Sequence, residues 1–150
     1  IQKLYPEVRS LRDASQEMLD TYVKAVDETV YRRCTYVVSE IKRLLNGCED
    51  LEKDDLISFG KRMFETHAGL KDLYEVSCNE LDLLVDLVKE NPGVIGARMM
   101  GGGFGGCTIN LVKSEAANDL IKKVSDAYLS ETGTEMLVYE VAIEDGTGVS

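Results

Sequence analysis

The sequence is poor in the residue types on which several classes of protein depend. It has no tryptophan, two prolines and a single histidine, His67. Its four cysteines are scattered and form no C-x-x-C pair, which argues against a zinc site, because such sites need clustered cysteine and histidine ligands. It also has no apolar run of the roughly 18 residues that a membrane-spanning helix needs. We therefore expect neither a metal site nor a membrane span.

Positive charge is scarce as well, since the formal net charge is −10. Nucleic acids and anionic membrane surfaces are bound through basic patches, so we expect neither as a partner. The overall field also repels phosphorylated ligands. Any such ligand must be attracted by a local feature of the backbone or by a metal ion.

The first residue and the cysteines bear on the origin of this sequence and on the cellular location of the protein. The sequence begins with Ile1 rather than methionine, and we expect it to be part of a longer protein. Nothing in it resembles a secretory signal, and scattered cysteines without one are typical of reduced thiols, so we expect a cytoplasmic protein. Cys107, beside a glycine-rich stretch, is expected to be a small buried side chain at the start of a strand.

The first half of the chain has helical periodicity. With 44% hydrophobic residues in a length of 150, we expect one domain, residues 1–150, with a substantial core. Apolar residues recur at intervals of three and four over 11–26, 30–45 and 56–67, which predicts three helices. Asp27 and either Asp54 or Asp55 are predicted N-caps, and Asn46-Gly47 is the predicted end of the second helix.

A fourth helix is predicted from a capping box formed by Ser77 and Glu80, and Pro92-Gly93 is expected to end it. Its predicted buried face is Leu81, Leu84, Val85 and Val88. His67 lies on the apolar stripe of the helix before it. We predict a packed, hydrogen-bonded histidine there rather than a general base.

The second half of the chain changes period. An apolar run over 94–100, the alternating segment 107–112 and the alternating segment 136–143 predict strands, and 114–132 predicts a helix between the last two. The polar tail 144–150 is expected to be turn-like. Strands joined by a six-residue loop are antiparallel neighbours. The fold class expected is therefore α+β, a two-layer sandwich of a small antiparallel sheet with several helices.

The loop between the first two strands holds five glycines in the six positions 101–106. Each ordered glycine lowers the stability of the folded chain by roughly 0.5–1 kcal/mol relative to alanine. The presence of five glycines in one loop therefore requires an explanation. A P-loop is excluded because Gly106 is followed by Cys107 and Thr108, so that cysteine stands where the motif requires a lysine before the hydroxyl residue. A dinucleotide fingerprint is excluded because a strand, not a helix, follows. Close backbone approach remains, with glycine amides forming a nest for anionic oxygens.

Two neighbours of these glycines have side chains that bear on the same question. Phe104 is expected to turn its ring back into the core, although a ligand is the alternative. Arg98 is the nearest cation and faces either a phosphate or solvent.

The segment GARMMGGGFGGCTINLV resembles the third signature motif of galactokinases, which belong to the GHMP small-molecule kinases. LRDAS, YRRCTYVVSEIKR, MFETHAGLKDLYEVSCNELDLLV and YEVAIEDGTGV follow the same family order. The resemblance covers nearly the whole chain and implies a GHMP kinase C-terminal domain. It also implies transfer of a phosphoryl group from ATP with Mg²⁺ to the anomeric hydroxyl of galactose.

The resemblance implies that the catalytic and binding motifs are divided between two domains. The G-R-x-N-x-I-G-E-H-x-D-Y sugar motif, the P-x-G-x-G-L-S-S-S phosphate loop and the catalytic aspartate belong to an N-terminal domain and are absent here. We therefore expect no catalytic residue and no metal ligand in this chain, which alone should turn over no ATP. The implied contribution to the cleft is the loop facing substrate and phosphates: Gly101, Gly102, Gly103, Phe104, Gly105 and Gly106.

The resemblance leaves other functions open. Galactokinase-like proteins include galactose sensors that bind a transcriptional repressor, and kinases for N-acetylgalactosamine. A mevalonate or homoserine kinase fits less well, because EVSCNELD is typical of galactokinase-like members. An apolar face toward the absent half would promote self-association of this chain, with Met99, Met100 and Phe104 as its expected residues.

Overall fold

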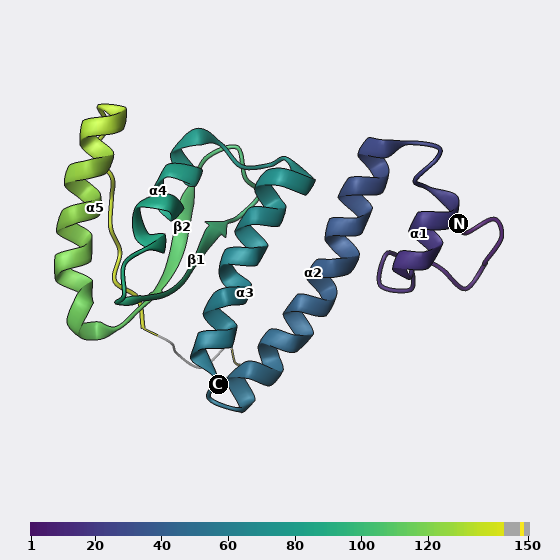
Figure 1. Ribbon diagram of the computed structural model, residues 1–150, viewed down its shortest axis with the longest axis horizontal. Helices are drawn as coiled ribbons and strands as arrows, with labels where there is room; N and C mark the ends of the chain where they lie inside the picture. The colour runs from purple at the N-terminus through teal and green to yellow at the C-terminus, as the bar shows by residue number, and fades with distance from the viewer. Residues whose placement is uncertain (143–147, 149–150) are drawn as a thin grey trace.

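The computed structural model describes residues 1–142 and 148 (Figure 1). Its elements, in chain order, are α1 (Gln16–Tyr22), α2 (Glu28–Glu52), α3 (Leu56–Gly69), the π-helical turn η1 (Leu70–Tyr74), α4 (Asn79–Lys89), β1 (Val94–Met100), β2 (Cys107–Val112), the 3₁₀ turn η2 (Ser114–Ala116) and α5 (Ala117–Thr132). No helix in this part of the chain is both long and apolar enough to cross a membrane.

The N-terminal helices begin at side chains that cap them. Asp27 accepts the amide N–H of Val30 at the start of α2, and Asp55 accepts that of Ser58 at the start of α3, so both predicted caps are confirmed. The first helix is shorter than predicted. Asp13 accepts amides within a turn upstream of it, and Ser15 begins α1 by accepting the N–H of Met18.

The predicted end of the second helix at Asn46-Gly47 is wrong, since α2 continues to Glu52. Gly47 is buried, and a Cβ there would be 3.5 Å from the nearest ring carbon of Phe59. That is an ordinary van der Waals distance, and the helical hydrogen bonds continue through this position. Arg62 of α3 also bonds to Asp50 of α2, with its Nη2 3.2 Å from Oδ1, which ties the two helices together.

The start of α4 differs from the predicted capping box. Cys78 is the N-cap and makes no side-chain cap bond, while Ser77 donates its hydroxyl to Asp82 instead. The helix begins one residue later than predicted, and the Ser77 hydroxyl is directed to a carboxylate five residues on instead of to the helix amides. The predicted buried face is confirmed: Leu81, Val85 and Val88 are buried and Leu84 is partly so.

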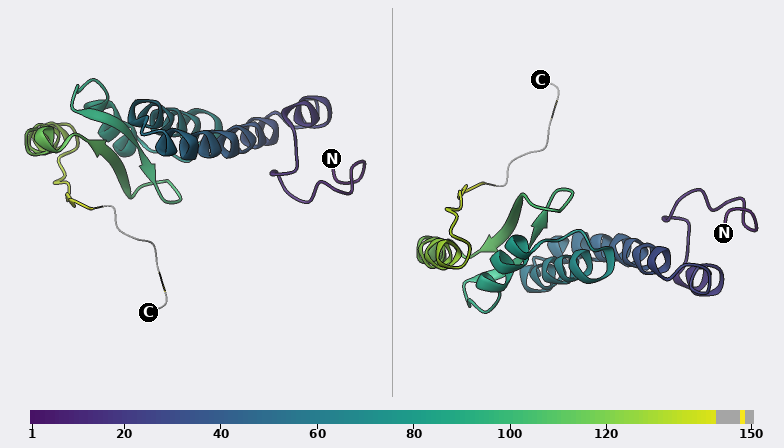
Figure 2. Two further views of the ribbon diagram at one scale, coloured as in Figure 1. Left: turned by 90° about the horizontal axis from the view of Figure 1, so that it is seen from below. Right: turned by 90° about the horizontal axis from the view of Figure 1, so that it is seen from above.

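The sheet and its layers match the sequence-based expectation. β1 and β2 pair antiparallel, from Val94 opposite Val112 to Met100 opposite Cys107. Helices α3 and α4 lie along one side of the two strands, as the end-on views show (Figure 2). α5 packs against α4, and α2 packs on the far side of α3 (Figure 1). The α+β, two-layer class is confirmed.

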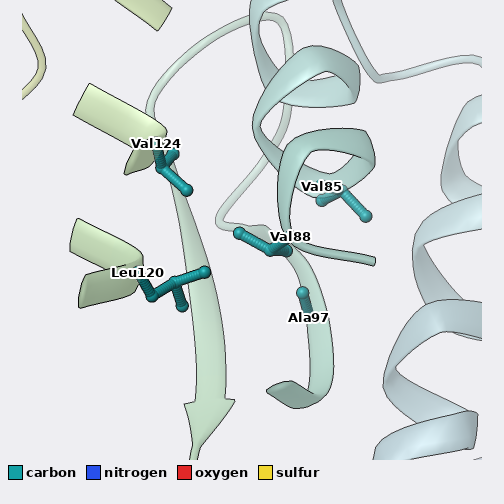
Figure 3. Packing of buried hydrophobic residues seen from close by; sticks show 5 residues of the cluster. All are labelled: Val85, Val88, Ala97, Leu120 and Val124. Carbon is teal, nitrogen blue, oxygen red and sulfur yellow. The ribbon is translucent and has the colours of Figure 1, made fainter. Parts of the chain in front are cut away.

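The main apolar core lies where α4, β1 and α5 meet. Its buried members are Val85, Val88, Ala97, Leu120 and Val124, whose side chains converge in Figure 3. Burial of a valine or leucine side chain is worth roughly 1.5–3 kcal/mol, so this cluster holds the sheet to the helices. It leaves the loop that connects β1 and β2 outside the core.

The predicted strand over 136–143 is wrong for its described part, 136–142, which forms no strand. Met136 packs against the core, but Leu137, Tyr139 and Val141 are 81%, 77% and 79% exposed. An alternating sequence forms a strand only when it pairs with another strand, and within the described residues β1 and β2 pair with each other alone. Ile143 and the predicted turn-like tail, except Gly148, lie outside the described residues.

Candidate functional site

The loop of residues 101–106, called the glycine loop below, connects the paired ends of β1 and β2. Its backbone is left-handed at Gly101, Gly103, Phe104, Gly105 and Gly106, with φ of 88°, 87°, 60°, 136° and 103°. Glycine adopts these angles without steric cost, whereas other residues are strained there. Conformation alone therefore accounts for four of the five glycines.

Gly103 is also required by a close contact. A Cβ at this position would lie 2.0 Å from the carbonyl oxygen of Val76. The next amide, that of Phe104, donates to the same oxygen at 2.7 Å. The loop is thus anchored at its centre to the segment between η1 and α4, and the close backbone approach predicted from the sequence is in part an approach to the protein itself.

Gly102 stands apart from the other glycines. Its φ is outside the left-handed region, and a Cβ there would have no heavy atom within 4 Å. Neither conformation nor a described neighbour requires glycine at this position. Outside the β1–β2 ladder, Phe104 is the one loop residue whose amide donates to a backbone carbonyl within the described chain.

Two side-chain predictions at the loop are wrong. Phe104 is 77% exposed rather than turned into the core, because its left-handed backbone and its bond to Val76 direct the ring outward. Cys107 is exposed rather than buried. It pairs with Met100, which is 44% exposed, so this end of the ladder projects beyond the covering helices.

The remaining predicted neighbours divide between core and surface. Met99 is fully buried, so it is not part of an exposed apolar face, whereas Met100 and Phe104 are exposed. Arg98 is partly buried and donates to the carbonyl of Met99 at 3.3 Å. Within the described residues it forms no ion pair.

His67 confirms the prediction of a packed, hydrogen-bonded side chain. It is 5% exposed, and its Nδ1 accepts the amide N–H of Met99 at 3.2 Å. Its Nε2 lies 3.3 Å from Oδ1 of Asp82. Burial lowers the pKa of His67, and this outweighs the opposing effect of the Asp82 carboxylate. The imidazole is therefore neutral at pH 7.

Asp82 is a functional candidate that the sequence reasoning did not single out. It accepts the Ser77 hydroxyl at 2.6 Å and lies 3.0 Å from the Lys71 ammonium through Oδ2. Burial alone would raise the pKa of Asp82, but the bonds from Ser77 and Lys71 outweigh it and the pKa is lowered. One feature of the sequence could have pointed to a partly buried Asp82: it directly follows Leu81, a residue predicted to be buried on the same helix.

Glu75 helps to hold in place the Val76 carbonyl, to which the glycine loop is anchored. It ends η1 in the left-handed conformation, with φ 61°, immediately before Val76. Its carboxylate lies 2.8 Å from Arg32 and 3.5 Å from Arg33 of α2. The strained turn that presents the Val76 carbonyl is held by charges on two elements.

The loop presents main-chain groups and one aromatic side chain. In the described part of the chain no three Cys, His, Asp or Glu side chains are grouped to hold a metal ion. The loop offers a main-chain surface free of side chains at its glycines, beside the exposed ring of Phe104. Such a surface suits contact with a ligand whose reacting groups are supplied elsewhere.

Comparison with known proteins identifies the family of this chain. Residues 48–129 match the family described as "GHMP kinases C terminal". The chain belongs to this GHMP kinase family. The matched range includes α3, α4, both strands and the glycine loop, so the resemblance read from the sequence is confirmed.

Similar proteins narrow the branch of the GHMP kinases. The galactokinase of Roseiflexus sp. (strain RS-1) is 37% identical over 148 residues, covering 99% of this chain and 38% of that protein. The galactokinase of Clostridium beijerinckii is 40% identical over 148 residues, covering 98% and 38%. Human galactokinase is 42% identical over 119 residues, covering 79% and 30%.

A solved structure is similar in fold as well. The Lactococcus lactis galactokinase complexed with galactose superposes with a TM-score of 0.79 at 36% identity, covering 85% of this chain and 33% of that one. The chain thus spans between 30% and 38% of the length of these relatives. The GHMP kinase chain described here corresponds to one part of such proteins.

Proposed function

We propose that this chain is the C-terminal part of a galactokinase, which transfers a phosphoryl group from ATP with Mg²⁺ to the anomeric hydroxyl of galactose. The proposal is supported by GHMP kinase membership and by galactokinases as relatives over nearly the whole chain. It is further supported by a similar fold in a galactokinase complexed with galactose. A cytoplasmic location is part of the same proposal.

The observation that carries the proposal for this chain is Gly102. Nothing within the described residues requires glycine there, yet the stretch resembling the galactokinase motif has glycine at this exposed position of the loop. We propose that Gly101–Gly106 form one wall of the substrate cleft. The wall lies close enough to sugar or phosphates that a side chain at Gly102 would intrude.

The rest of the machinery belongs, in this proposal, to the part of the protein that the chain does not cover. Phosphoryl transfer relies on positioning and charge stabilisation, with a base that receives the hydroxyl proton. Residues 1–150 constitute the C-terminal domain and supply the wall, while ATP, Mg²⁺ and most sugar contacts lie in the other domain. Residues 1–150 alone then turn over no ATP.

The test is ADP release by the full-length protein with galactose, with N-acetylgalactosamine and with no sugar, beside residues 1–150 under the same conditions. We expect galactose-dependent release from the full-length protein only. A preference for N-acetylgalactosamine would show the alternative kinase, and galactose binding without ADP release would show a sensor. Release by residues 1–150 would contradict the division between domains.

A further inference from the structure

Two hydrogen bonds fix the glycine loop, and both lead to Asp82. The first runs from the Met99 amide, just before the loop, to Nδ1 of His67 at 3.2 Å. The second runs from the Phe104 amide to the carbonyl of Val76 at 2.7 Å. His67 Nε2 lies 3.3 Å from Asp82 Oδ1, and Ser77, the neighbour of Val76, donates to the same oxygen at 2.6 Å.

The hydrogen-bonding pattern assigns the proton on His67. Nδ1 faces an amide donor, so it must present a lone pair, and the ring proton is on Nε2. A carboxylate can only accept, so Asp82 favours this tautomer and not the other. The imidazole therefore connects the edge of β1 to a carboxylate on α4 across a buried contact.

The position of His67 on α3 matches a second contact of the same two elements. Gly60 lies against the backbone of β1, where a Cβ on Gly96 would be 2.5 Å from the Gly60 Cα. Seven residues of helix from Gly60 to His67 rise about 10.5 Å, and three residues of strand from Gly96 to Met99 extend about 10 Å. His67 thus meets Met99 because helix and strand stay in step, which sets where β1 ends and the loop begins.

We propose that His67 and Asp82 are positioning residues for the glycine loop: Asp82 holds His67 in the Nε2–H tautomer, and His67 Nδ1 holds the Met99 amide. This inference rests on the proposed function, because it assigns the pair a role in phosphoryl transfer. Neither residue touches the reacting atoms. Both act by keeping the main chain of the loop at a fixed place in the cleft.

Two amide substitutions at His67 separate the halves of this contact. In His67→Asn the side-chain oxygen takes the place of Nδ1 and still accepts the Met99 amide, while the contact with Asp82 is lost. In His67→Gln the side-chain nitrogen takes the place of Nε2 and still donates to Asp82, while the Met99 amide loses its acceptor. The variants are matched in polarity, so a general loss of packing affects both.

The kinetic test uses the full-length protein. We expect His67→Asn to retain kcat within about threefold and His67→Gln to lose roughly 10-fold to 100-fold, since small displacements of positioning groups cost that much. We expect a smaller change in KM for galactose. Equal kcat in the two variants, or a larger loss in His67→Asn, would overturn the proposal.

A second measurement does not depend on activity. ¹⁵N NMR of the full-length protein labelled at histidine reports the tautomer, and the His67 signals are those that disappear in His67→Asn. We expect a bare Nδ1 and a protonated Nε2 at pH 7, with a weaker preference for this tautomer in Asp82→Ala, which removes the carboxylate that accepts from Nε2. A proton on Nδ1 in the unsubstituted protein would overturn the proposal. A wild-type protein that phosphorylates no sugar would instead refute the proposed function and leave this result standing.

Discussion

His67 is the residue at which charge and structure are most directly coupled. Its lone pair is engaged by the Met99 amide, and burial lowers its pKa. The charged groups around it are Asp82 and Asp86 of α4 and Lys71 of η1. Protonation of Nδ1 would set two donors against each other inside the fold, so the folded state disfavours the imidazolium.

The pH dependence of stability follows from that coupling. Because the pKa of His67 is lower in the folded state, the unfolded state binds a proton first as the pH falls below about 6.5. The free energy of unfolding should therefore decrease between pH 7 and pH 5. The lowered pKa of Asp82 adds a further decrease at more acidic pH. Denaturant unfolding at a series of pH values measures this.

The matched control is His67→Asn, which has no titrating group at this position. Its stability should vary less between pH 7 and pH 5 than that of the unsubstituted protein. The same slope in both proteins would mean that His67 titrates alike in the folded and unfolded states, contrary to the arrangement described.

Among the elements, the contact between α3 and β1 depends on glycine rather than on side chains. A Cβ on Gly60 would lie 2.0 Å from the Ile95 carbonyl oxygen. A backbone atom cannot move aside as a flexible side chain can. The helix and strand are therefore in direct main-chain contact, and this contact carries His67 to the edge of the glycine loop.

Gly60→Ala should lower the free energy of unfolding by about 2–3 kcal/mol, because it forces the helix away from the strand. Gly47→Ala is the control within α2. Its Cβ would make an ordinary 3.5 Å contact with Phe59, and alanine favours helix by up to about 1 kcal/mol. Denaturant unfolding of both variants tests this, and equal destabilisation would contradict the difference in packing.

The elements also show where sequence reasoning succeeds and where it stops. The caps at Asp27 and Asp55, the buried face of α4 and the β1–β2 pair depend on neighbours in the chain, and all were predicted. The continuation of α2 through Gly47, a position that is buried in the fold, and the missing strand at 136–142, which would need a partner strand, depend on contacts with distant residues. Such long-range conditions leave no local pattern.

The candidate site was predicted in the same uneven way. The run of glycines located the loop, and the apolar stripe predicted a packed His67. The anchor at Val76 and the carboxylate of Asp82 were missed, because a backbone carbonyl has no signature in sequence and an aspartate near a helix start looks like an ordinary surface residue. Phe104 and Cys107 were placed inward because apolar residues usually are, whereas left-handed backbone turned Phe104 outward.

At the scale of the whole molecule, the chain combines a packed α+β body with a glycine loop. The packing of that body does not explain all of the glycines in the loop. The body accounts for Gly103 through Val76 and for the left-handed glycines through their backbone angles. It does not account for Gly102. We propose that this GHMP kinase chain forms one wall of a shared sugar and phosphate cleft. A substitution at Gly102 therefore tests this proposal most directly.

The decisive measurement is the galactose kinase activity of the full-length protein carrying Gly102→Val. Among the described residues no heavy atom lies within 4 Å of a Cβ at this position, and its φ is outside the left-handed region, so the thermal unfolding midpoint should stay unchanged. We expect a loss in kcat/KM of roughly 100-fold, because a side chain at this position displaces the reacting groups. Sugar phosphorylation at the normal rate by this stable variant would contradict it.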